Sequence, residues 1–228
     1  MSVATVAGLL LVTVPLAFNA AFALLAARFD YPDVLRRPTA EVLERFRAGG
    51  SGLVLLWWGF ALTAVLMVPL VVLLSRALAD VDGALLAVTT AVGVLAAAVQ
   101  FLGLVRWPFL VPMLARMDAE AGPARRDAVD VVFQSFNRYL GVGVGEHLGY
   151  LFTGAWTVLT GVAMWQTEVV PSWLGDVGLL VGVALMTCSL EFVGRFEPEG
   201  WKVAERLTPL AYVAWSLWLV ATGVALLV

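Results

Sequence analysis

Long, uninterrupted apolar runs recur along the chain and constrain its fold more than any other feature. A helix needs about 20 apolar residues to cross a bilayer core about 30 Å thick, and these runs reach that length. Only 14% of the residues are charged and the mean hydropathy is +0.93, so the chain has too little polar surface to enclose a core in water. The sequence therefore predicts a multi-pass membrane protein with no soluble domain.

We predict six spans, at about residues 4–27, 52–75, 84–106, 141–165, 173–194 and 206–228. The runs are continuous rather than alternating, and open strands cannot satisfy their backbone groups in lipid, so all six are expected to be helices. The predicted fold class is all-α: residues 1–228 form a single integral membrane domain, a polytopic bundle of six transmembrane helices. The first span is longer than the apolar region of a secretory signal, so we expect it to be retained.

The basic residues predict the orientation of the bundle. They concentrate in the first, third and fifth connections: Arg28, Arg36, Arg37, Arg45 and Arg47; Arg116, Arg125, Arg126 and Arg138; Arg195, Lys202 and Arg206. On the opposite side only Arg76 is basic. Because cytoplasmic connections carry the excess of Lys and Arg, these three connections are expected to be cytoplasmic and both termini outside.

The residues of two connections predicted to be cytoplasmic indicate their structure. Between the first two spans we predict an interfacial helix, with Thr39 as its cap, an apolar face of Val42, Leu43 and Phe46, and a Glu41–Arg45 pair. A connector packed on the helix ends would show the same pattern. Residues 116–140 are too charged for hydrocarbon, and we expect a surface loop that becomes helical before the fourth span.

Prolines and glycines mark the third and fourth spans. Pro108 and Pro112 remove backbone donors, so we expect a kink after the third span. In the fourth span, Gly141, Gly145 and Gly149 recur every four residues and form a strip of small side chains. Such a strip lets a neighbouring helix approach closely.

Polar residues inside the spans are expected at one level, in the inner half of the bilayer. The predicted layer consists of Asn19, Gln100, Arg106, Glu146, His147, Tyr150 and Glu191. On an α-helix Glu146 shares a side with Tyr150, whereas His147 turns toward Leu151, so the two adjacent groups are expected to need different partners. Arg106 is the expected partner of Glu146, either in a closed structural bridge or at the edge of a cavity open to the cytoplasm or inner leaflet.

The sequence does not contain the residues that several kinds of cofactor and metal site require. The chain has one histidine, whereas transmembrane haem requires a pair, and its only lysine, Lys202, lies outside the spans, where it cannot form a retinal Schiff base. Zinc and di-iron sites need more ligands than Glu146 and His147 supply. We therefore expect no metal and no cofactor, and the net charge of −3 gives no reason to expect nucleic acid. Cys188, the single cysteine, is expected to pack within a span.

Two stretches carry a resemblance to a known family. "GLVRWPFLVPMLAR" at 103–116 and "RYLGVGVGEHLGYLFTGAWT" at 138–157 resemble small bacterial multi-pass membrane proteins known only as a domain of unknown function, and the likeness extends over nearly the whole chain. The resemblance implies a compact helical bundle in the bacterial cytoplasmic (inner) membrane. It assigns no catalytic residues.

Three functions remain open from the sequence. The first is binding or transport of a lipid or small amphiphile in a cytoplasm-facing pocket, with Arg106 attracting an anionic group and Glu146, His147 and Tyr150 hydrogen-bonding to it. The second is an intramembrane enzyme that uses Glu146 or His147 as general acid or base on a lipid-soluble substrate. The third is an accessory subunit of a membrane complex. Membrane lipid is the expected partner, and self-association or a partner membrane subunit is open.

Overall fold

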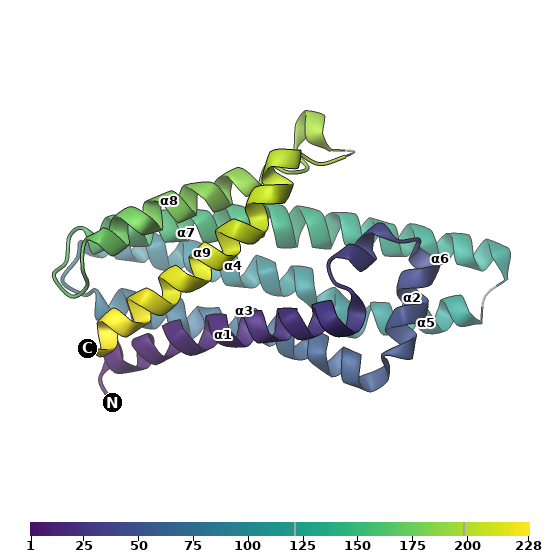
Figure 1. Cartoon of the computed structure of the whole chain (residues 1–228), viewed down its shortest axis with the longest axis horizontal. Helices are drawn as coiled ribbons and strands as arrows, with labels where there is room; N and C mark the ends of the chain where they lie inside the picture. Colours follow the sequence, from purple (N-terminus) through teal and green to yellow (C-terminus); the bar gives the residue numbers. More distant parts are fainter. Residues whose placement is uncertain (121, 198) are drawn as a thin grey trace.

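The chain is helical throughout the part that its computed structural model describes, residues 1–120, 122–197 and 199–228 (Figure 1). No strand occurs in these three segments, so the predicted all-α class is confirmed. The elements are α1 (Val3–Phe29), η1 (Asp33–Arg36), α2 (Thr39–Ala48), α3 (Gly50–Ala77), α4 (Gly83–Phe109), α5 (Val111–Ala119), α6 (Pro123–Phe136), η2 (Asn137–Leu148), α7 (Gly149–Met164), α8 (Trp173–Cys188), η3 (Gly194–Phe196) and α9 (Lys202–Leu227).

Four helical segments are long and apolar enough to cross a membrane: α1, α3, α4 together with α5, and α9. The other two predicted spans are shorter as α-helices, since α7 and α8 each have 16 residues. α7 is extended at its start by η2 and α6, which run into it without a turn. α8 ends at Cys188, before the predicted limit at residue 194, and this places Glu191 in the connection to α9 rather than in a span.

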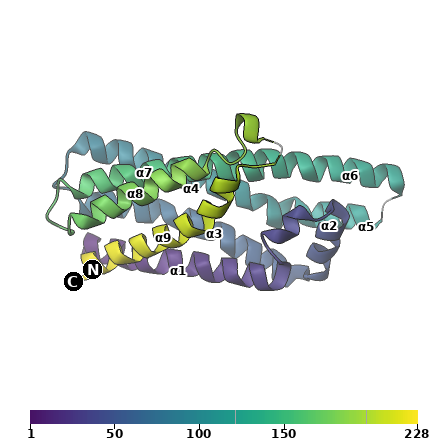
Figure 2. The same ribbon diagram turned by 45° about the horizontal axis from the view of Figure 1, so that its top comes forward.

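The helices lie lengthwise, with the connections gathered at two ends (Figures 1 and 2). Both termini share one end with the α3–α4 and α7–α8 turns. The opposite end holds α2, α5 and α6. The connection from α8 to α9 emerges between the two ends and carries η3.

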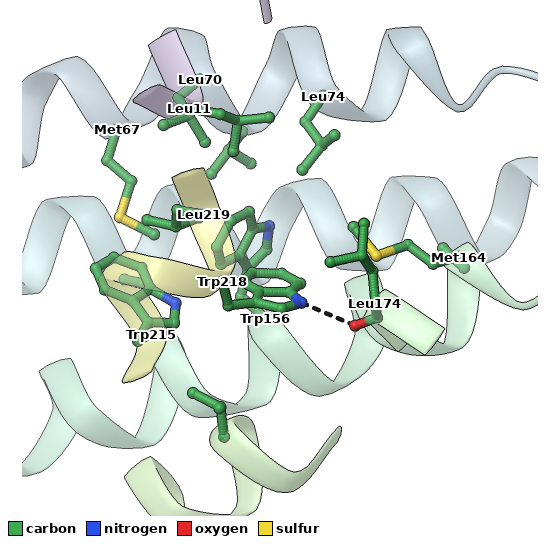
Figure 3. Packing of buried hydrophobic residues seen from close by; sticks show 14 of the residues in the cluster. Leu11, Met67, Leu70, Leu74, Trp156, Met164, Leu174, Trp215, Trp218 and Leu219 are labelled. Atoms are coloured by element: carbon green, nitrogen blue, oxygen red, sulfur yellow. Dashed lines mark hydrogen bonds between the residues drawn. The ribbon is translucent and has the colours of Figure 1, made fainter. Parts of the chain in front are cut away.

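Tryptophans form the centre of the larger core, as Figure 3 shows. Trp156, Trp215 and Trp218 pack with leucines from α1 and α3. Their polar edges are used inside the protein, because Trp218 Nε1 donates to the Leu174 carbonyl at 2.8 Å and Trp215 Nε1 donates to Thr157 Oγ1 at 2.9 Å. These indoles therefore fix α9 against α7 and α8.

A second core lies at the end that holds α2. The Trp57 and Trp107 rings stack with centroids 4.4 Å apart, and Phe29 meets both rings edge-on. Phe46 of α2 stacks on Trp107. This aromatic cluster ties the connecting helix α2 to the ends of α1, α3 and α4.

The predicted helix between the first two spans is present as α2, and it is packed on protein. Val42, Leu43 and Phe46 are buried, and Arg45 Nε lies 3.3 Å from Glu41 Oε1, as expected. The prediction that Thr39 caps this helix is wrong, because Pro38 occupies the cap position and the Thr39 hydroxyl donates to Asp130 of α6. α2 thus corresponds to the connector alternative.

The predicted surface loop within residues 116–140 is wrong in its first part. α5 and α6 form a helical hairpin against α2, and Val129 and Phe133 of α6 are buried. Charged residues misled the prediction because they cover only the outer face of each helix. Where a kink is predicted near Pro108 and Pro112, α4 ends at Phe109 and α5 begins at Val111, with Leu110 between them in αR conformation.

Glycines bring α4 and the start of the fourth span into backbone contact. A Cβ on Gly103 would lie 2.5 Å from the Gly145 Cα, and one on Gly149 would lie 3.2 Å from the Gln100 side chain. The predicted glycine strip therefore packs on α4. α7 meets α8 in the same way on another side, where Gly154 faces Gly182.

We predict that Gly103→Ala destabilises the bundle by about 1–3 kcal/mol, because its methyl group collides with a backbone that no rotamer change moves away. Gly59→Ala is the matched control, since nothing lies within 4 Å of the Cβ it adds in the middle of α3. Thermal unfolding of the detergent-solubilised protein measures both. Equal midpoints for the two variants would show that the α4 contact is not tight.

Candidate functional site

The polar part of the fourth span is a π-helix rather than an α-helix. η2 covers the 12 residues Asn137–Leu148 and leads into α7 at Gly149. A π-helix bonds each residue to the fifth one along, and such segments are frequent at functional sites. It therefore changes the directions in which Glu146 and His147 point from those of an ideal α-helix.

Arg106 is held at the start of this π-helix. Its guanidinium donates to Asn137 Oδ1 at 3.0 Å and to the Gly103 carbonyl, and it lies 5.4 Å from the centre of the Trp107 ring. A Cβ on Gly141 would approach its Nη2 to 2.6 Å, so the missing side chain makes room for the guanidinium. Arg106 is only 8% exposed.

The predicted Arg106–Glu146 bridge is wrong: the two groups interact through space, but no ion pair joins them. Arg106 faces the first turn of η2, whereas Glu146 lies near its end. Arg106 also borders neither of the two cavities described below, so the predicted role of attracting an anionic ligand there has no geometric basis.

Gln100 and Asn19 are separate from Glu146 as well. Gln100 Nε2 donates to Thr153 Oγ1 at 2.7 Å, and Asn19 Nδ2 donates to Ser216 Oγ at 3.0 Å and to the Pro15 carbonyl at 2.7 Å. Gln100 borders an apolar cavity of about 20 Å³. Both amides therefore join helices. The predicted layer is not a single site: some of its residues make hydrogen bonds between helices, and others border one cavity.

That site is a cavity of about 240 Å³ between η2 and the connection that follows α8. Four of the predicted residues border it: Glu146, His147, Tyr150 and Glu191. The remaining lining residues are Arg138, Val142, Gly143, Cys188, Ser189, Phe192, Val193 and Glu197. Glu146 and His147, for which different partners are predicted, both border this cavity, and of the two only His147 has a hydrogen-bond partner in the described residues, the Ser189 carbonyl.

The His147 ring has a fixed orientation. Its Nδ1 lies 2.7 Å from the Ser189 carbonyl oxygen. A carbonyl only accepts, so Nδ1 carries the proton and donates, and the neutral ring keeps Nε2 as an acceptor. The end of α8 therefore determines which form of the imidazole borders the cavity.

The Glu146 carboxylate has no hydrogen-bond or ion-pair partner among residues 1–120, 122–197 and 199–228. Protein atoms surround it deeply, yet it keeps some accessible surface, as expected of a side chain that borders an internal cavity. Its charge acts on three tyrosines, Tyr31, Tyr150 and Tyr212. Tyr150 and Tyr212 meet with ring centroids 5.4 Å apart.

Glu191 is the second carboxylate at the cavity. It lies just beyond α8, where partial burial and then the nearby Glu205 carboxylate raise its pKa above the usual value. Arg138 contributes the one arginine of the lining, and it is occupied: it forms an ion pair with Glu197 and lies 5.3 Å from the centre of the Phe192 ring.

Sequence reasoning missed five residues of this neighbourhood: Arg138, Glu197, Phe192, Tyr31 and Tyr212. Arg138 was considered only among the basic residues that predict the orientation of the bundle. The others are distant in sequence from Glu146 and carry no motif, so nothing in the order of residues indicated their approach. Within the described part of the chain, no three His, Cys, Asp or Glu side chains gather in a way that would hold a metal ion.

Comparison with known proteins gives one match. A family model described as "Domain of unknown function (DUF4386)" covers residues 6–223. No curated protein and no solved structure matches the chain.

We predict that Asn137→Ala destabilises the protein by about 1–3 kcal/mol, because it removes a hydrogen bond from the buried Arg106 guanidinium. Ser135→Ala, which changes an exposed position two residues earlier, is the control and should have no effect. Thermal unfolding in detergent compares the two. An unchanged midpoint for Asn137→Ala would mean that Arg106 does not hold the start of η2.

Proposed function

The chain belongs to the family of the domain of unknown function DUF4386, and we propose that it binds or transports a lipid or small amphiphile within the bacterial inner membrane. The binding site is the cavity bordered by Glu146, His147, Tyr150 and Glu191. One observation carries this proposal: ionisable side chains border a partly open cavity beside η2, and one of them, Glu146, has no partner in the described residues.

The proposed topology has six crossings with both termini outside. The 16 residues of α8 span about 24 Å at 1.5 Å per residue, somewhat less than a bilayer core about 30 Å thick, and η2 lengthens α7. The termini lie at the end of the bundle away from α2, α5 and α6 (Figure 1). These last three helices carry many of the arginines, which supports placing them in the cytoplasm.

The position of the cavity supports an amphiphile as ligand. Its lining is polar where η2 supplies Glu146 and His147, and apolar where Val142, Val193 and Phe192 border it. Such a mixture suits a molecule with one polar end and one apolar end. The volume of about 240 Å³ accommodates a head group and part of a chain, so the remaining tail would lie along the bundle surface.

An intramembrane enzyme is the second candidate, favoured by the fixed His147 ring. Nδ1 donates to Ser189, so Nε2 is available as a general base beside the Glu146 carboxylate. Turnover of a bound amphiphile that is lost in His147→Gln, with binding retained, would support this function over simple binding.

We predict that the protein, purified in mild detergent, retains a lipid or amphiphile that native mass spectrometry detects, and that Gly143→Leu removes it. Gly143 borders the cavity, and a Cβ there meets only the Arg138 carbonyl oxygen at 3.7 Å, so a leucine can extend from this position without a clash at its first atom. Gly59→Leu adds the same side chain where nothing lies within 4 Å. A ligand retained equally by both variants does not occupy this cavity, and a stoichiometric protein partner instead would favour the accessory subunit.

We predict that a cysteine at position 2 reacts with an impermeant maleimide in intact cells, whereas one at position 44 reacts only after the membrane is permeabilised. The variants Ser2→Cys and Glu44→Cys are made in a Cys188→Ser background, and both positions are exposed. The reverse labelling pattern would invert the proposed topology and place the arginine-rich connections outside.

A further inference from the structure

The cavity beside η2 is lined by more acidic than basic side chains. Three carboxylates border it, from Glu146, Glu191 and Glu197, against a single arginine. That arginine, Arg138, already pairs with Glu197. Two carboxylates are therefore left without an ion-pair partner in the part of the chain that the structure describes.

Other cations in the described residues do not pair with these two carboxylates. Arg36 and Lys202 act on Glu191 only through space, since both pair with Glu205. Arg106 acts on Glu146 only through space. Its guanidinium donates hydrogen bonds to Asn137 Oδ1 and to the Gly103 carbonyl, and it lies in the space left by the missing side chain of Gly141. It lies on the α4 side of η2, outside the cavity lining. A charge buried without a partner is costly, so the Glu146 carboxyl either takes up a proton or pairs with a cation, and a cationic ligand would stabilise its ionised form.

The hydrogen-bonding groups at the cavity also favour a ligand of positive charge. Glu146 and Glu191 only accept when ionised, and the His147 Nε2 of the neutral ring accepts because Nδ1 donates to Ser189. The Tyr150 ring adds an aromatic surface, which attracts cations. The Tyr150 hydroxyl can donate or accept, so the lining offers several acceptors and acidic side chains against few donors for an anionic head group.

We propose that the ligand of this cavity is a protonated amine with an apolar tail, whose ammonium group is held by Glu146 and Glu191 and donates to His147 Nε2. This inference rests on the proposed function, since it specifies the head group of the amphiphile. An ammonium is small enough for the space, and its N–H groups match the acceptors that border it. Val142, Val193 and Phe192 line the path for the tail.

The test uses probes that share a ten-carbon tail and differ in the head group: decylamine, decyltrimethylammonium, decanol and decanoate. Binding to the full chain in nanodiscs is measured for the unaltered protein and for Gly143→Leu, so that the difference reports the cavity alone. We expect decylamine to bind at least about tenfold more tightly than decanol and decanoate, because hydrogen bonds to charged groups contribute about 1.5–3 kcal/mol each. Decyltrimethylammonium, which has the charge without N–H donors, should fall between decylamine and decanol.

Glu146→Gln tests the counter-charge directly. It keeps the size of the side chain and breaks no hydrogen bond among the described residues, so we expect the protein to fold and to lose about tenfold in decylamine affinity with decanol affinity unchanged. Glu44→Gln, a carboxylate on α2 that does not border the cavity, should change neither affinity.

The outcomes separate this inference from the proposed function. If Gly143→Leu reduces the binding of none of the probes, the cavity is not an amphiphile site, and both the proposed function and the amine inference fail. If the probes bind at the cavity with equal affinity, or decanoate binds best, the amphiphile site stands and the amine is refuted. The amine is refuted as well if Glu146→Gln leaves decylamine affinity unchanged.

Discussion

The contact between the backbones of α4 and η2 is the constraint on which the polar architecture depends. Gly103 and Gly145 approach so closely that neither tolerates a side chain, and Gly141 leaves space for the Arg106 guanidinium. In lipid, water supplies no driving force between helices, so close van der Waals packing of small residues takes its place. With this side of η2 fixed on α4, its other side is turned toward the connection after α8, and Glu146 and His147 border the cavity there.

Polar groups in this bundle are satisfied in two ways. Gln100, Trp215 and Trp218 each donate to a partner on another helix, and Asn19 donates both to Ser216 of α9 and to the Pro15 carbonyl of its own helix. These bonds hold the helices together. Glu146 has no such bond in the described residues and borders a cavity instead. Since a polar group in a membrane interior is costly, the difference between the two kinds of residue is informative. The first kind is explained by architecture, and the second calls for a ligand.

The sequence predicted those features that depend on local pattern. Apolar length located the long helices, the spacing of Gly141, Gly145 and Gly149 indicated a packing face, and the Val42, Leu43 and Phe46 face identified α2. Features that depend on which residues of other helices a side chain contacts were not predictable from the sequence. Arg106 binds Asn137 at the start of η2, which is a π-helix, and no periodicity in "NRYLGVGVGEHL" distinguishes that form from an α-helix. The early end of α8 was hidden because residues after Cys188 remain apolar, and it moved Glu191 from a span to the cavity edge.

The π-helix also explains how donors and acceptors come to lie on different sides of one short segment. On the α4 side are Arg106 and, in the aromatic cluster beyond it, the Trp57 and Trp107 indoles, whose buried N–H groups have no partner in the described residues. On the cavity side are Glu146, Glu191 and the acceptor nitrogen of His147. An ideal α-helix would send Glu146 and His147 about 100° apart, whereas here both reach the same space. The separation keeps the arginine from neutralising Glu146 by direct contact, and the proposed cationic head group depends on this arrangement.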